Sequence, residues 1–156
     1  MNTNKNVSES KRVRRAIRAQ KQQCYKNAVR VIWKVPEYKN ADYVEGYAVV
    51  GGKLCIEHGW VEQDGIVIDP TLLDEGIVYF PGLRFTGERG IAKAIEIPKE
   101  KWCKDLPFFF RFGWGGIESP EFRAAIVAAF RYAGCEDTAR RYESFDQESI
   151  RQVTAV

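Results

Sequence analysis

The dipeptide Asp64-Gly65 constrains the fold of this chain more than any other feature of its sequence. It separates two short runs of apolar residues, and Asp-Gly in that position is a strong signal for a two-residue β-hairpin turn. Such a turn pairs Gln63 with Ile66. It also makes His58 and Asp69 diagonal neighbours on one face of the hairpin, with their backbones about 7–8 Å apart. A turn one residue longer or shorter would place these two side chains on opposite faces.

The segments around this hairpin predict a mixed fold. Residues 43–50 read as a strand, and Gly51-Gly52 marks a tight turn into the first strand of the hairpin. Together these segments predict a three-stranded antiparallel meander. Helices are predicted at 24–34 and at 119–133, where Ser-Pro-Glu is a strong start signal. The sequence therefore predicts the α+β class, with helices packed on an antiparallel sheet.

Two apolar stretches in the second half of the chain predict further strands. Residues 91–97 alternate enough for a strand that Pro98 ends. The stretch 106–112 predicts a core strand followed by a glycine loop. The alternative is an aromatic wall or lid over a cleft, since Trp114 stands between glycines that permit movement.

Length and composition indicate a single domain. A chain of 156 residues, of which 45% are hydrophobic and 29% charged, can bury one sizeable core. We expect a disordered polar lead-in at 1–10 and one domain at 11–156. There is no apolar run near about 18 residues and no secretory signal at the N-terminus, so no membrane partner is expected and the predicted location is cytoplasmic.

The basic segment 11–21 has two interpretations. It carries six cations and no acid. A solvated helix face is the favoured interpretation, and a patch for an acidic partner or nucleic acid is the alternative. No aromatic residues interleave with these cations to stack on bases, and a net charge of +3 is small. Nucleic acid is therefore not the expected partner.

The cysteines lack the spacing of a disulfide framework or of a paired metal site. In a reducing compartment they are predicted to be free thiols. A zinc site built on Cys55 and His58, with Cys24 and Asp69, is an alternative. However, residues three apart on a strand point to opposite faces, so no metal is predicted. No cofactor is expected either. The four cysteines are Cys24, Cys55, Cys103 and Cys135.

Cys24 and His58 are the candidate catalytic residues of the sequence. Cys24 stands at the start of the predicted helix 24–34, where the positive end of the helix dipole favours a thiolate. His58 is the only histidine. A buried, inert cysteine and a histidine with a purely structural hydrogen bond are the alternatives. A carboxylate at Asp69 would orient the imidazole, and the imidazole would activate the thiol.

The order of these motifs resembles a known family. Cys24 and its helix are followed by Tyr43-Val44-Glu45-Gly46-Tyr47, by His58-Gly59-Trp60-Val61-Glu62 and by Asp69-Pro70-Thr71. This pattern is similar to the transglutaminase-like branch of the papain-like cysteine enzymes, over about a third of the chain. The chain departs from the family at Gly59, where alanine is usual, and at Asp42, where arginine is common. A short interval between cysteine and histidine indicates a pared-down member.

The resemblance implies a papain-like or transglutaminase-like core, in which a helix bearing the cysteine packs on an antiparallel sheet bearing histidine and aspartate. It implies a catalytic triad of Cys24 as nucleophile, His58 as general base and then acid, and Asp69 as the orienting carboxylate. The expected activity is a cysteine hydrolase or acyltransferase that acts through a thioester. Its substrate would be a peptide, a protein or a small amide, with an amide, peptide or isopeptide bond as the target.

An oxyanion site and a shield complete the prediction. The backbone N–H of Cys24 is one expected donor to the oxyanion. Trp60 lies on the face of His58 and could shield the ion pair from water, or it could simply pack. Two other functional classes stay open, namely a catalytically silent papain-like binding domain and a small basic nucleic-acid-binding protein. The candidate side-chain donors to the oxyanion are Gln20, Gln22 and Gln23.

Overall fold

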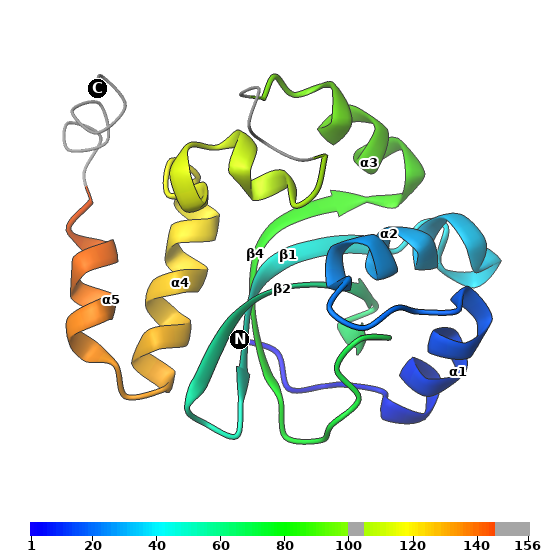
Figure 1. The fold of residues 1–156 in the computed structure, drawn as a ribbon, viewed down its shortest axis with the longest axis horizontal. Helices are drawn as coiled ribbons and strands as arrows, with labels where there is room; N and C mark the ends of the chain where they lie inside the picture. Colours follow the sequence, from blue (N-terminus) through cyan, green and yellow to red (C-terminus); the bar gives the residue numbers. More distant parts are fainter. Residues whose placement is uncertain (100–104, 146–156) are drawn as a thin grey trace.

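The computed structural model describes residues 1–99 and 105–145 (Figure 1). Its described part has five α-helices and a four-stranded antiparallel sheet with the order β3-β2-β1-β4. The predicted α+β class is therefore correct. The elements are α1 (Val7–Ile17), α2 (Cys24–Lys34), η1 (Pro36–Tyr38), β1 (Asp42–Val50), β2 (Leu54–Gln63), β3 (Ile66–Ile68), β4 (Val78–Thr86), α3 (Gly87–Glu96), η2 (Phe108–Arg111), η3 (Trp114–Gly116), α4 (Pro120–Tyr132) and α5 (Glu136–Glu143), where η marks a short 3-10 helix.

The central hairpin has the predicted register. Gln63 pairs with Ile66, and the two turn residues Asp64 and Gly65 have φ angles of 53° and 75°. Two successive positive φ angles are the geometry of a type I′ turn, whose twist matches that of the flanking strands. The second strand of the hairpin is short, so β2 is an edge strand at His58 and can be approached there from the side.

Three apolar clusters enclose the sheet. One joins α1, α2 and α3 to one end of the sheet, and a second joins α4 to the other end of the same face. The third lies on the opposite face, where Trp60 and Tyr79 pack together. In Figure 1, α1 and α2 lie to the right of the strands and α4 and α5 lie to the left.

The fourth strand, β4, was not predicted. Pro81 and Gly82 interrupt its sequence, and proline cannot donate to a ladder. The strand tolerates Pro81 because it lies at the edge of the sheet, and the register against β1 shifts between Glu45 and Gly46. Such a shift admits one extra residue on one strand and bends it locally.

Two predicted strands are wrong. Residues 91–97 were expected to form a strand, but α3 covers most of them, with Ile91 and Ala94 buried at helical spacing. The stretch 106–112 was expected to be a core strand, but it contains the 3-10 helix η2. Its buried residues Phe108 and Phe109 donate their backbone N–H groups to the carboxylate of Glu45, with distances of 2.7 Å each.

The N-terminal residues differ from the expected disordered lead-in. Asn2 pairs with Tyr79 and Lys5 pairs with Val67 through isolated bridges, and Asn6 caps α1 by accepting the backbone N–H of Glu9. None of the described helices is long and apolar enough to cross a membrane.

Candidate active site

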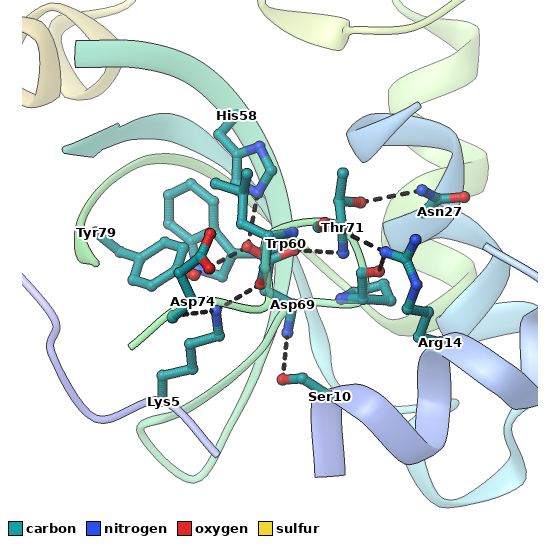
Figure 2. A network of polar contacts seen from close by, with 12 residues as sticks. Lys5, Ser10, Arg14, Asn27, His58, Trp60, Asp69, Thr71, Asp74 and Tyr79 are labelled. Atoms are coloured by element: carbon teal, nitrogen blue, oxygen red, sulfur yellow. Dashed lines mark hydrogen bonds and ion pairs between the residues drawn. The ribbon is translucent and has the colours of Figure 1, made fainter. Parts of the chain in front are cut away.

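The end of the hairpin brings His58 and Asp69 together as its register predicts. His58 Nε2 lies 2.8 Å from Asp69 Oδ2, and both side chains are buried (Figure 2). Asp69 follows β3 directly and begins the loop Asp69-Pro70-Thr71. His58 is therefore held by the sheet, and Asp69 is held by the loop that follows it.

Every oxygen of Asp69 is held. Oδ2 also accepts the hydroxyl of Tyr79 at 2.9 Å, and Oδ1 accepts the backbone N–H groups of Thr71 and Leu72 at 2.8 and 3.1 Å. Burial alone would raise the pKa of Asp69, but the charge and hydrogen bond of His58, the charge of Lys5 and the N–H of Thr71 outweigh it and lower that pKa. Asp69 is thus a carboxylate with a fixed orientation.

The environment of His58 favours imidazolium. Burial by itself lowers the pKa of the ring. The charge and hydrogen bond of Asp69, followed by a hydrogen bond and the charge of Cys24, oppose burial and raise the pKa of His58 to about 9. This shift favours the imidazolium form of the ring, in which both nitrogens carry a proton.

Cys24 is the first residue of α2, as predicted, and α2 packs against β2. Its side chain is half-buried and lies close enough to His58 to raise the pKa of the imidazole. Because Asp69 occupies Nε2 of the ring, Nδ1 is the nitrogen that remains for the sulfur. The structure thus pairs His58 with Asp69 and places Cys24 near enough to influence the His58 ring.

Asn27 ties the segments that carry these residues. Its side-chain oxygen accepts the backbone N–H of Gln20 at 3.0 Å, and its amide donates to the Gln20 carbonyl at 2.7 Å and to Thr71 Oγ1 at 3.0 Å. Asn27 is fully buried one turn into α2. It therefore connects the segment that precedes Cys24 with the loop that bears Asp69.

Trp60 lies where the hairpin register predicts it. Its ring is fully buried and stacks near His58, with centroids 6.1 Å apart and an interplanar angle of 15°. The indole N–H donates to Glu62 at 2.9 Å. Trp60 thus both packs in the core and shields one side of the His58 ring from water.

The three glutamines lie just before α2 in the chain. The side chains of Gln20 and Gln22 are exposed, and that of Gln23 is half-buried. Gln23 holds the position before the helix but makes no capping hydrogen bond. The first backbone N–H groups of a helix have no partner within the helix, so they are donors that an oxyanion could use.

Cys55 points away from His58, as the strand parity predicts. Its thiol lies 3.5 Å from the carbonyl oxygen of Ala129 on α4. Among the residues that the structure describes, no group of three or more His, Cys, Asp or Glu side chains is placed to hold a metal ion. Cys24, Cys55 and Cys135 are free thiols, and Cys103 lies outside the described residues.

The N-terminal segment supplies residues that the sequence interpretation missed. Ser10 Oγ accepts the backbone N–H of Asp69 at 3.0 Å, and Arg14 donates to the carbonyl oxygens of Pro70 and Thr71 at 2.9 and 3.3 Å. Figure 2 shows Asp69 between the His58 ring and Ser10, with Arg14 beside the loop. The other five cations of the basic segment are exposed, as the solvated-face interpretation predicts, but Arg14 holds the aspartate loop. No local signal marks such a long-range contact.

Gly59 lies beneath Tyr25, where its lack of a side chain is required. A Cβ on Gly59 would stand 2.6 Å from Cδ1 and 3.2 Å from Cα of Tyr25. We expect Gly59→Ala to destabilise the protein by about 1–3 kcal/mol. It should also slow alkylation of Cys24, because the start of α2 is pushed away from His58. Urea unfolding and a timed alkylation assay measure the two effects.

The control for this prediction is a double-mutant cycle. Removing the ring with Tyr25→Ala relieves most of the clash, so the two substitutions together should cost less stability than the sum of the single changes. Strictly additive losses of stability would show that the contact between Gly59 and Tyr25 does not set the distance between α2 and β2.

No family model, no curated protein and no solved structure matches this chain. The functional interpretation therefore depends on the geometry of the site and on the order of its motifs.

Proposed function

We propose that this protein is a cysteine hydrolase or acyltransferase with a papain-like, transglutaminase-like core. The observation that carries the proposal is the buried pair of His58 and Asp69, with Cys24 at the start of α2 near enough to raise the pKa of His58. An imidazole that is fixed by a carboxylate and contacts a thiol at a helix start is the arrangement that activates a cysteine nucleophile.

Each residue has a defined role in the reaction. Cys24 rests as a thiolate beside the imidazolium of His58 and attacks the acyl carbon of an amide. Backbone N–H groups at the start of α2 hold the oxyanion. His58 then donates its proton to the leaving amine, and the C–N bond breaks to leave a thioester on Cys24. Asp69 keeps the ring in place throughout.

The thioester can pass to water or to an amine. His58, now neutral, takes a proton from the attacking group, and the thiolate of Cys24 leaves with its electron pair. Hydrolysis is the default because water is always present. The substrate is a peptide, a protein or a small amide. Free thiols at Cys24, Cys55 and Cys135 suit a reducing compartment such as the cytoplasm.

An acyl-enzyme assay tests the proposal. After brief mixing with p-nitrophenyl acetate, we expect one acetyl group, on Cys24, by peptide mass spectrometry. Cys24→Ser should lose this adduct, and His58→Ala should lower the acylation rate by about 10²–10⁴-fold, the usual contribution of a general base. Equal acetylation of Cys24, Cys55 and Cys135 would contradict the proposal. It would favour a catalytically silent binding domain.

A further inference from the structure

Lys5 contacts β3, the loop after Asp69 and Tyr79, all of which contact or carry Asp69. Its backbone pairs with Val67 of β3, which brings the side chain to the aspartate loop. The ammonium donates to the carbonyl oxygens of Leu72 at 2.5 Å and of Asp74 at 3.1 Å. It also lies 5.9 Å from the ring centroid of Tyr79, whose hydroxyl donates to Asp69.

The charges of the site explain why a cation is useful there. The proposed mechanism needs a thiolate at Cys24, an imidazolium at His58 and a carboxylate at Asp69, and these three charges sum to one negative charge. A net charge removed from water is costly unless another charge balances it. Lys5 is half-buried and close enough for its charge to act on Asp69, so the sum over these four groups is zero. Asp74 also lies near Lys5, but its side chain is exposed to water, which screens its charge.

We propose that Lys5 is a positioning residue of the active site, which balances the charge of the Cys24–His58–Asp69 group and holds the aspartate loop. This inference depends on the proposed function. It makes the segment before α1 part of the catalytic apparatus.

Removing this charge has a defined effect on the thiol. The ionisable groups around Lys5 are Asp69 and Asp74 on the loop and Tyr79 on β4, with His58 and Cys24 beyond Asp69. Without the ammonium the site is more negative, so the thiolate forms less readily. The acid limb of the alkylation profile of Cys24 should therefore move upward by about half a pH unit, or about three-fold in rate at a fixed acidic pH.

The test uses the full chain and iodoacetamide, with each cysteine read separately by mass spectrometry across pH. Lys5→Met should shift the acid limb upward, and Lys5→Arg, which keeps the charge, should restore it. The matched control is Lys11→Met, which removes an exposed cation of α1 and should leave the profile unchanged. If circular dichroism shows that Lys5→Met is unfolded, Lys5→Gln keeps donors for the loop carbonyls without the charge.

Three results overturn the inference while the proposed function stands. They are an unshifted profile in folded Lys5→Met or Lys5→Gln, an equal shift in Lys5→Arg, and an equal shift in Lys11→Met. If Cys24 of the unmodified protein shows no excess reactivity at acidic pH, both the proposed function and the role of Lys5 are wrong.

Discussion

In the native protein at about pH 5.5, iodoacetamide should alkylate Cys24 at least about ten times faster than Cys55 or Cys135. An ordinary thiol with a pKa of about 8.5 is only about 0.1% thiolate there. We expect the imidazolium of His58 and the start of α2 to stabilise the thiolate of Cys24. A stabilised thiolate is a weaker nucleophile, so part of the gain in thiolate fraction is lost, which leaves a factor of about ten or more. Mass spectrometry of the separate peptides measures each rate.

His58→Ala supplies the decisive comparison. It should remove most of the excess reactivity, because only the helix dipole remains to stabilise the thiolate. Cys55 is an internal reference, since burial, with a smaller contribution from Cys135, raises the pKa of its thiol. If Cys24 in folded protein reacts no faster than an exposed model thiol at acidic pH, the proposed cysteine-dependent activity is ruled out. The catalytically silent binding domain is then the interpretation that remains.

The part of the site that the sequence predicts is the part that local rules determine. Turn chemistry at Asp64-Gly65 sets the register, and strand parity then places His58 and Asp69 on one face. Cys24 is found at the start of α2 because the helix signals are also local. The hairpin and the helix start are local signals, but they do not bring Cys24 to His58. That step depended on the resemblance of the motif order to the transglutaminase-like family.

Other elements could not be predicted because their local signals are ambiguous or misleading. A short apolar run such as 91–97 fits both a strand and a helix, and contacts with the core select the helix. Pro81 argues against a strand unless the edge position of β4 is known. No local signal marks Glu45 as buried. It is fully buried, and Tyr43, Phe108 and Phe109 donate hydrogen bonds to its carboxylate.

The N-terminal contribution to the site was beyond sequence reasoning for a different reason. Lys5, Ser10 and Arg14 are residue types that occur on any solvated helix or lead-in. Their contacts join segments that are far apart in the chain, and no periodicity or motif encodes such contacts. Only the packing of α1 beside the hairpin shows that these polar side chains hold the Asp69 loop.

Asp69→Asn should lower the pKa of His58 from about 9 to its ordinary value or below. The substitution keeps the shape of the side chain but removes the largest influence that favours imidazolium. Burial, which lowers the pKa of His58, is then opposed mainly by Cys24. Because His58 is the only histidine, a proton NMR titration of the imidazole signals in D2O measures this pKa without an assignment step.

The same substitution should change how stability depends on pH. The pKa of His58 is raised on folding from its ordinary 6.5 to about 9, so the stability it contributes is fully present below about pH 6.5 and is lost as the pH rises through 9. The free energy of unfolding should fall by about 3 kcal/mol across that range in the unmodified protein. In Asp69→Asn the fall should largely disappear, because the folded and unfolded pKa values become similar.

Denaturant unfolding between about pH 7.5 and 9.5 is the cleanest window for this comparison. Burial raises the pKa of Glu45 to about 7, so most of its titration is complete below this window. Asp64→Asn is the matched control, because Asp64 is exposed in the hairpin turn and Asn-Gly favours the same turn. A fall in stability that persists in Asp69→Asn would show that the imidazolium of His58 does not depend on Asp69. The NMR titration of Asp69→Asn would then have to show an unchanged pKa of His58. The two measurements therefore test independently whether Asp69 raises the pKa of His58.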